Sequence, residues 1–172
     1  MDVRIGTAKI SALEATQALQ WPTLALGQNS SAERFCMQPT KVSAATRDRL
    51  LRDARKAMKN AYAPFSKFKV GAAILTSKGR VFVGCNVENS SYGLTNCAER
   101  TAIFSAVAEA GPELEIKAVA VANGDGTACS PCGACRQVIY EFGPRAVIFY
   151  QGKQGLKQSL ITDLLPEGFR LK

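Results

Sequence analysis

Three cysteines at the beginnings of two predicted helices limit the folds that are open to this chain. Cys132 and Cys135 are spaced C-x-x-C at the start of the segment CGACRQVIYEF, so both side chains leave the first turn of one helix. Cys97 opens a second predicted helix, CAERTAIFSAVAEA, with Asn96 as its expected N-cap and Gly111 just past its end. Helix N-termini favour thiolates, the form that binds metal ions. Since each of these helices follows a predicted strand of the same sheet, their N-termini can face each other.

The segments around these helices alternate between helical and extended patterns. Apolar residues recur at helical spacing from Thr46 to Ala61, until Pro64 ends the pattern, which predicts an amphipathic first helix. The β-prone runs KVGAAILT and RVFVGCNV are joined by Ser77-Lys78-Gly79, which has the length and the glycine of a hairpin turn. The later runs IKAVAVA and AVIFY are predicted strands with a helix between them. Strands separated by helices need crossovers, so we expect an α/β fold with a mixed sheet, helices on both faces, a short terminal strand and the helical turn ITDLLP.

Residues 1–43 differ in composition from the rest of the chain. They are rich in Ala, Ser, Thr and Gln and show no sustained period, which is typical of loosely ordered segments. We therefore expect a poorly ordered N-terminal extension over residues 1–43 and one domain over residues 44–172. A mitochondrial transit peptide is usually rich in Arg and poor in acidic residues, whereas Asp2, Glu14 and Glu33 occur here. We expect a cytoplasmic protein, with mitochondrial targeting by this extension as the alternative.

Charge and cysteine content narrow the possible partners and sites. The formal net charge is +8, and eight basic side chains gather between Arg47 and Lys69, where we interpret them mainly as the solvated face of the first helix. Charged residues interrupt every long apolar run after Pro39, so no membrane span is expected. The chain has six cysteines, no histidine and no evident secretory signal, which indicates a reducing compartment and a metal site built from thiolates, carboxylates or water.

Three thiolates supply three of the four ligands of a tetrahedral zinc ion and leave one position open. An open position is typical of catalytic zinc sites, whereas structural sites have four protein ligands. Glu99 follows Cys97 closely enough to stand beside the open position, where it can take a proton from a water and return it to a substrate. A C-x-x-C pair alone would also fit a structural zinc half-site or a redox pair. The combination of C-A-E-R with S-P-C-G-A-C-R-Q favours the catalytic interpretation.

Four blocks of sequence between Ala61 and Glu141 carry a resemblance to a known family. The blocks AYAPFSKFKVGAAI, GCNVENSSYGL, NCAERTAIF and SPCGACRQV resemble, in order and spacing, those of the small, homotetrameric, zinc-dependent cytidine deaminases. The resemblance implies a three-layer α-β-α cytidine deaminase-like fold with a mixed five-stranded sheet, a homotetramer, and zinc (Zn2+) held by Cys97, Cys132 and Cys135. It also implies hydrolysis of free cytidine and deoxycytidine to uridine and deoxyuridine, with release of ammonia, in pyrimidine salvage.

The resemblance also implies which residues bind the nucleoside. Asn86 and Glu88 fall where the family holds the ribose, and an amide next to a carboxylate suits hydrogen bonds to sugar hydroxyls. A carboxylate there also disfavours an anionic substrate, which favours nucleosides over nucleotides. Phe68 lies where the family packs an aromatic ring beside the pyrimidine. The alternatives are an ordinary polar loop for Asn86 and Glu88 and a core position for Phe68.

Further residues correspond to other parts of the family's site. The backbone of Ala98 and the carbonyl of Ser130 correspond to groups that contact the pyrimidine edge and the leaving amino group. Tyr92 and Phe169 are the candidates for completing the site of a neighbouring subunit. Arg100 corresponds to an arginine that hydrogen-bonds the ligand sulfurs and offsets their negative charge, with a surface charge on the helix as its alternative. Cys36, Cys85 and Cys129 match no ligand position, and Cys85 is predicted to be a small buried residue.

The predicted reaction uses Glu99 as a proton shuttle. Glu99 takes a proton from zinc-activated water, protonates N3 of the ring and carries a second proton to the amino group. Three other functions compete with this prediction: a deaminase of a related aminopyrimidine drug such as blasticidin, a nucleic-acid-binding module or editing deaminase, and a purely structural zinc protein. The blocks GCNVEN and PFSKF favour cytidine, and the sequence shows no recognisable RNA-binding fold. We therefore expect a small-molecule nucleoside as substrate and no stable nucleic-acid partner.

Overall fold

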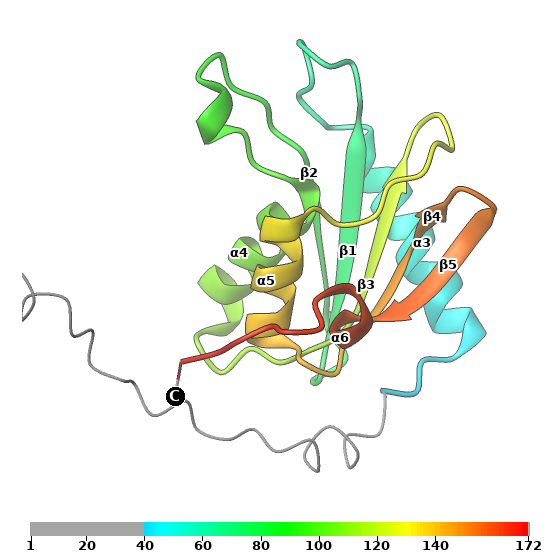
Figure 1. Cartoon of the computed structure of the whole chain (residues 1–172), viewed down its shortest axis with the longest axis vertical. Coiled ribbons are helices and arrows are strands. Elements are labelled where there is room, and N and C mark those ends of the chain that lie inside the picture. The colour runs from blue at the N-terminus through cyan, green and yellow to red at the C-terminus, as the bar shows by residue number, and fades with distance from the viewer. Residues whose placement is uncertain (1–39, 172) are drawn as a thin grey trace, which may run out of the picture. The chain divides into compact units, whose positions relative to one another are not determined.

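A five-stranded mixed sheet forms the centre of the computed structural model, which describes residues 40–171. The strands are β1 (Val70–Thr76), β2 (Val81–Cys85), β3 (Ile116–Asn123), β4 (Val147–Gly152) and β5 (Gly155–Leu160), in the spatial order β2-β1-β3-β4-β5 (Figure 1). β3 and β4 pair in parallel, and the other neighbours pair antiparallel, as the predicted mixed sheet requires. Residues 1–39 of the extension predicted over residues 1–43, and with them Cys36, lie outside the described residues.

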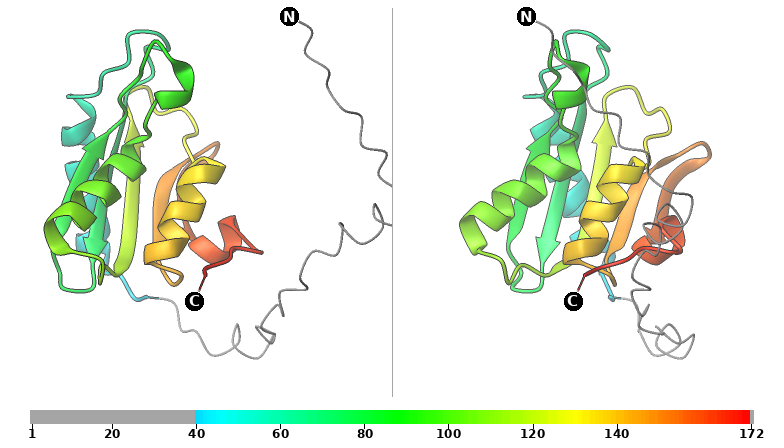
Figure 2. Two further views of the ribbon diagram at one scale, coloured as in Figure 1. Left: turned by 90° about the vertical axis from the view of Figure 1, so that its left-hand side faces the viewer. Right: turned by 60° about the vertical axis from the view of Figure 1, so that its left-hand side comes forward.

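Helices cover both faces of this sheet. α3 (Ala44–Met58) packs on one face, and α4 (Ala98–Ala110) and α5 (Gly133–Phe142) pack on the other (Figure 1, Figure 2). The short 3-10 helix η1 (Tyr92–Leu94) lies between β2 and α4, and α6 (Ile161–Leu164) follows β5. The predicted three-layer α-β-α fold is therefore confirmed. None of the described helices is long and apolar enough to cross a membrane.

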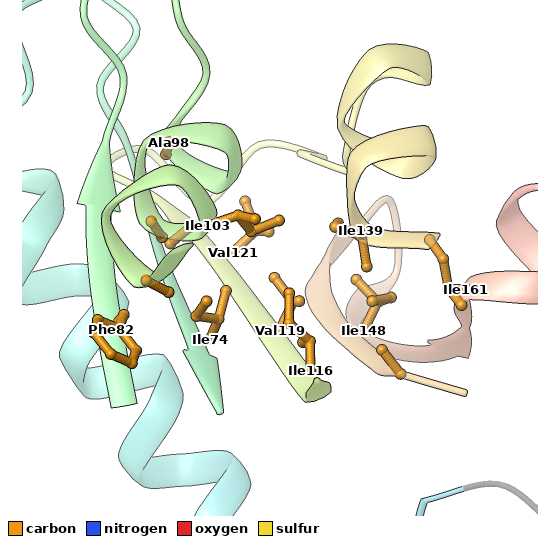
Figure 3. Packing of buried hydrophobic residues seen from close by; sticks show 14 of the residues in the cluster. Ile74, Phe82, Ala98, Ile103, Ile116, Val119, Val121, Ile139, Ile148 and Ile161 are labelled. Carbon is orange, nitrogen blue, oxygen red and sulfur yellow. The ribbon is translucent and has the colours of Figure 1, made fainter. Parts of the chain in front are cut away.

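Strand β3 contributes side chains to the hydrophobic cores on both faces of the sheet. Its sequence is almost uninterrupted in apolar residues because both of its faces are buried. Alternate side chains point to opposite faces, so Ala118, Ala120 and Ala122 face α3, while Val119 and Val121 face α4 and α5. The core on the α4 and α5 side also contains Ile74, Ile103, Ile139, Ile148 and Ile161 (Figure 3).

Two glycines allow helices to approach the backbone of the strands. A Cβ atom at Gly71 would lie 2.0 Å from the Ala54 carbonyl oxygen of α3. A Cβ atom at Gly84 would lie 2.4 Å from the Ala102 nitrogen of α4. Both distances are far below van der Waals contact, so only glycine permits this packing. The close approach at Gly84 sets α4 directly against β2.

The sheet topology brings the beginnings of α4 and α5 to the same edge. β2 and β3 run in the same direction because both pair antiparallel with β1, which lies between them. β2 leads through a loop into α4, and β3 leads through a loop into α5. Both helices therefore start at the edge where these two strands end, as Figure 2 shows.

The starts of these two helices differ in one respect from the prediction. Cys97, and not the predicted Asn96, is the N-cap of α4, and Cys132 is the N-cap of α5. Neither cysteine side chain makes a capping hydrogen bond. Asn96 was a reasonable cap by residue type, but its Nδ2 donates to the Thr101 hydroxyl at 3.1 Å instead. The cysteine sulfurs are thus free to bind a shared ligand.

The first helix begins earlier and ends earlier than the predicted pattern from Thr46 to Ala61. α3 begins at Ala44, where the Ser43 hydroxyl accepts a hydrogen bond from the Thr46 N–H at 3.1 Å. It ends at Met58, and the N–H of Ala61 donates to the Met58 carbonyl at 3.0 Å in a turn. The residues between the helix and β1 therefore form a loop.

Candidate metal centre and adjoining pocket

The sulfur atoms of Cys97, Cys132 and Cys135 come together where α4 and α5 begin. All three lie within 4.8 Å of one another, and the sulfurs of Cys97 and Cys132 are 3.8 Å apart. Sulfur ligands of a tetrahedral zinc ion, each about 2.3 Å from the metal, are about 3.8 Å from one another. The donor type and the spacing therefore fit zinc. Within residues 40–171 no fourth side-chain ligand joins the cluster, which leaves one position of a tetrahedral shell for a water or a substrate.

The pKa values of Cys97 and Cys135 are shifted in opposite directions. The pKa of Cys97 is lowered to about 5, chiefly because its thiolate accepts a hydrogen bond from the Cys135 thiol, and also because it contacts Arg100 and the Cys132 thiol. The same hydrogen bond, together with burial, raises the pKa of Cys135. At neutral pH Cys97 is therefore a thiolate that accepts a hydrogen bond from Cys135, even without a cation. This charge distribution favours the binding of a metal ion.

Arg100 places a positive charge beside this cluster. Its Nη2 donates to Cys97 Sγ at 3.5 Å and to the Thr95 carbonyl at 3.3 Å. Its Nε is buried and has no hydrogen-bond partner within the described residues. The guanidinium of this half-buried side chain therefore contacts the sulfur of Cys97. A cation at this place offsets part of the negative charge of three thiolates.

Glu99 is the buried carboxyl group of the site. It lies in the first turn of α4, and only 4% of the residue is exposed. Burial raises the pKa of Glu99 to about 7, and the neighbouring Cys97 thiolate contributes to the same shift. A carboxyl group whose pKa is close to neutrality can both accept and donate protons at physiological pH. Glu99 therefore has the acidity that the predicted proton shuttle needs.

Ala98 and Ser130 lie next to two of the ligand cysteines in the chain. Ala98 is completely buried as the first residue of α4, directly after Cys97. Ser130 is exposed and stands before Pro131, which is buried, and Cys132. The backbone groups of both residues thus belong to the two helix starts that carry the cluster.

Asn86 holds the loop that carries Phe68. Its Nδ2 donates to the Phe68 carbonyl at 2.9 Å, and its Oδ1 accepts from the Val70 N–H at 2.8 Å. The Phe68 ring is partly buried against the core on the α4 and α5 side. The Asn86 carboxamide keeps one N–H and one lone pair for a ligand, because an amide offers two of each. The structure therefore brings two of the predicted nucleoside-binding residues together.

Glu88 binds the same loop through its carboxylate. It accepts hydrogen bonds from the Phe65 N–H at 2.8 Å, from the Ser66 N–H at 3.3 Å and from the Ser66 hydroxyl. These bonds, that of the Ser66 hydroxyl above all, hold the pKa of Glu88 below its ordinary value. Glu88 is therefore an anion in a defined position beside the Phe68 loop.

Tyr92 and Phe169 are exposed aromatic residues in different segments. Tyr92, in η1, is 76% exposed and meets the Phe65 ring edge-on, with the ring centroids 5.9 Å apart. Phe169 follows α6 and is 66% exposed, while its carbonyl accepts a hydrogen bond from Gln137 Nε2 at 2.9 Å. Large exposed apolar side chains are typical of surfaces that contact another chain.

Cys85 and Cys129 lie outside the cysteine cluster. Cys85, at the end of β2, is half-buried, whereas the sequence predicted a buried residue. It is more exposed than predicted because β2 is an edge strand of the sheet. Cys129 is half-buried, and burial raises the pKa of its thiol to about 11. Cys129 is therefore a neutral thiol at physiological pH.

Two residues that contact the site were not singled out from the sequence. Ser66 holds Glu88, and Arg136 donates hydrogen bonds to the segment before Cys132. Arg136 carries a signal that could have been used, because a basic residue near the start of a helix opposes the helix dipole. Ser66 carries no such signal, since its partner is brought close only by the fold.

Comparisons with known proteins agree with this geometry. The family model of the cytidine and deoxycytidylate deaminase zinc-binding region matches residues 44–151, a range that includes the three cysteines and Glu99. The cytidine deaminase of Sporosarcina psychrophila is 46% identical over 124 residues, which cover 71% of this chain and 90% of the relative. The probable cytidine deaminase of Dictyostelium discoideum is 45% identical over 114 residues, which cover 66% of this chain and 76% of the relative.

Solved structures show the same likeness in three dimensions. The crystal structure of cytidine deaminase from Burkholderia pseudomallei matches with a TM-score of 0.66 and 50% identity, and the match covers 72% of this chain and 99% of that one. The cytidine deaminase structure from Mycobacterium tuberculosis matches with a TM-score of 0.64 and 41% identity, over 72% of this chain and 97% of that one. The matches therefore span nearly the whole of both solved chains.

Proposed function

Because this chain belongs to the zinc-dependent cytidine deaminase family, a family of hydrolases, we propose that it converts free cytidine and deoxycytidine to uridine and deoxyuridine and releases ammonia. One observation carries the proposal. It is the centre of three sulfurs with one position left for a water, next to a buried carboxyl group whose pKa is about 7. A structural zinc site would instead be closed by four protein ligands.

Glu99 performs the proton transfers in the proposed reaction. When bound to the three cysteines, zinc supplies Lewis-acid activation of a water in the open position. Glu99 accepts a proton from the attacking water and delivers it to N3 of the pyrimidine ring. Once the water oxygen is bonded to C4, Glu99 takes the second proton from that hydroxyl group and delivers it to the amino group, so that the C4–N bond breaks, the C4 carbonyl forms and ammonia leaves. Burial of Glu99 supports this role, because bulk water has little access to its carboxyl group.

Backbone groups at the two helix starts are suited to orient the base. Ala98 is the first residue of α4, and the first N–H groups of a helix have no partner inside the helix. We assign its backbone to the pyrimidine edge. The Ser130 carbonyl is assigned to the leaving amino group, to which an acceptor is complementary. Phe68, on its loop, is assigned to the face of the ring.

Glu88 and Asn86 are assigned to the sugar. Glu88 is held as an anion, and an anion accepts hydrogen bonds from sugar hydroxyls. The same charge repels a phosphate, so we propose that nucleosides are preferred to their 5′-monophosphates. Conversion of free cytidine-type nucleosides to uridine-type nucleosides suits pyrimidine salvage in the cytoplasm, which we propose as the setting.

We further propose that the chain forms a homotetramer in which Tyr92 and Phe169 reach the site of a neighbouring subunit. The support is the exposure of both rings, together with Phe104 on α4, which is 49% exposed. Sedimentation equilibrium tests the assembly. A mass near four times the chain mass of 18.4 kDa is expected, and a monomer would contradict the proposal.

One assay tests the proposed substrate class. Zinc-loaded protein is incubated with cytidine, deoxycytidine, their 5′-monophosphates, cytosine and a cytosine-containing single-stranded oligonucleotide, and loss of the cytosine chromophore is followed. We expect turnover of the two nucleosides and at least about 100-fold lower kcat/KM for the other compounds. Turnover of the oligonucleotide or of the monophosphates in preference to the nucleosides would contradict the proposal.

A further inference from the structure

Arg136 binds the segment that leads to the ligand Cys132. Its Nε donates to the Pro131 carbonyl at 2.8 Å, and its Nη2 lies 3.5 Å from the Ser130 hydroxyl. Its Nη1 donates to the Leu164 carbonyl of α6 at 3.0 Å. Within residues 40–171 the structure records no ion pair between this guanidinium and a carboxylate. Its hydrogen bonds therefore go to uncharged oxygen atoms, two of which belong to the backbone.

A similar arrangement exists at the start of α4. Arg100 donates to the Thr95 carbonyl five residues before it, and Arg136 donates to the Pro131 carbonyl, also five residues before it. A cation near the start of a helix opposes the helix dipole, so neither arginine is there for the stability of its own helix. In both helices the arginine folds back over the residues that deliver a cysteine N-cap. Because both arginines bind a backbone carbonyl before a cysteine N-cap, we infer that both hold the chain segment that leads to that cysteine.

The segment in front of Cys132 is held from two sides. At its beginning, the Cys129 N–H donates to the Gln151 carbonyl of β4 at 2.8 Å. At the end of the segment, the Arg136 guanidinium donates a hydrogen bond to the Pro131 carbonyl. The same guanidinium donates to the Leu164 carbonyl of α6, which holds it in place. Only a planar group with donors on several edges can join these oxygens at once, so a lysine cannot replace it.

We propose that Arg136 is a positioning residue of the deaminase reaction, which fixes the Ser130–Pro131 segment so that the Ser130 carbonyl meets the amino group as it leaves. The inference rests on the proposed function, which assigns that carbonyl to the amino group. The contact matters most in the transition state, where the amino group gains a proton. A displacement of about 1 Å in such a contact can cost about 100-fold in rate.

The test compares Arg136→Lys and Arg136→Met with Arg145→Lys in zinc-loaded, full-length protein. Arg145 is a matched control, because it is exposed and its Nη2 binds Glu115 at 3.1 Å. We expect kcat for cytidine to fall about 10- to 100-fold in both Arg136 variants while KM changes less than about threefold. Zinc content should stay at the wild-type value in all three variants, and kcat should stay at the wild-type value in Arg145→Lys. Equal losses in the lysine and methionine variants would show that geometry, rather than charge, is required.

Hydrogen exchange measured by mass spectrometry gives a readout that does not depend on activity. Without substrate, the peptide over residues 128–135 should exchange faster in both Arg136 variants than in the wild type, while peptides from β3 should not change. Wild-type kcat in Arg136→Lys, unchanged exchange in that peptide, or a loss of kcat in proportion to lost zinc would overturn the inference. A wild-type protein that does not act on cytidine would overturn the proposed function instead, and the exchange result would then still decide whether Arg136 fixes the segment.

Discussion

The sulfur atoms of Cys97 and Cys132 lie 3.8 Å apart, although 35 residues separate them in the chain. This is the distance between two sulfur ligands of one tetrahedral zinc ion. It arises because β2 and β3 run in the same direction on either side of β1 and deliver α4 and α5 to one edge of the sheet. The metal centre is therefore a product of the sheet topology, and its geometry depends on how firmly the two helix starts are held.

Replacement of one ligand cysteine should remove the metal. In Cys135→Ala the buried sulfur is lost, and the two sulfurs that remain cannot hold zinc tightly, so zinc per chain should fall from about one to below about 0.1. Elemental analysis of the purified proteins measures this. Cys85→Ala is the control, because Cys85 lies outside the cluster, and it should keep its zinc. A full complement of zinc in Cys135→Ala would show that the metal binds elsewhere.

Loss of Arg100 should weaken zinc binding without abolishing it. Arg100 contributes to the low pKa of Cys97, so Arg100→Gln raises that pKa and makes the thiolate harder to form. Substitution of a residue that supports the ligands typically lowers metal affinity about 10- to 100-fold. Competition with a chromogenic chelator measures the affinity, with Arg145→Gln as the control. An unchanged affinity in Arg100→Gln would contradict the role given to its contact with Cys97 Sγ.

A methyl group at Gly84 should push α4 away from the sheet. In Gly84→Ala the new Cβ would lie 2.4 Å from the Ala102 nitrogen and 2.6 Å from the Ala98 carbonyl oxygen. Overpacking of this kind typically lowers the free energy of unfolding by about 1–3 kcal/mol, which corresponds to several degrees in the unfolding temperature. In Gly124→Ala the new Cβ would meet only the Met58 side chain, at 3.8 Å, so this control should unfold like the wild type. Equal stability of the two variants would be evidence against the close packing of α4 on β2.

The pH dependence of nucleoside binding should depend on Ser66. Its hydroxyl makes the largest contribution to the lowered pKa of Glu88. A group with a lowered folded pKa stabilises its contacts above its unfolded pKa, and this contribution is lost as the pH falls through the folded pKa. We therefore expect KM for cytidine to be unaffected by Glu88 down to about pH 4.3, the ordinary glutamate value, and to rise below it. In Ser66→Ala the pKa of Glu88 moves up, so the rise in KM should begin at a higher pH than in the wild type. Superimposable KM profiles for the two proteins would contradict this account.

Much of the fold could be predicted because its signals are local. The apolar run IKAVAVA and the helical spacing around Leu50 are contained in short windows of sequence, and each marks an element that the structure shows. The alternation of strands and helices then predicts helices on both faces of a mixed sheet. The exact start of α4 could not be predicted, because Asn96 is a good capping residue by type. Its side chain bonds Thr101 instead, a choice between two local contacts that residue type does not decide.

The part of the candidate site that consists of short sequence motifs could be predicted. The three cysteines and Glu99 belong to two short blocks at helix starts, and the predicted topology allows these starts to meet. The contact of Arg100 with a ligand sulfur was implied only by the family resemblance. Ser66 and Glu88 come into contact only because a loop folds onto the residues after β2, and no spacing of residues in the sequence predicts that contact. The hydrogen bond from Arg136 to the Leu164 carbonyl likewise joins segments that only the fold brings together.

Turnover of cytidine by Glu99→Gln, measured together with its zinc content, tests the central claim most directly. Glutamine keeps the size of the side chain but can neither take a proton from water nor deliver one to the ring. We predict zinc bound at the wild-type level and a fall in kcat of at least about 1000-fold, because general acid-base catalysis typically contributes 100- to 10,000-fold and Glu99 acts in two transfers. Wild-type kcat in a fully zinc-loaded Glu99→Gln protein would contradict the account, since the proton shuttle would then have to be another group.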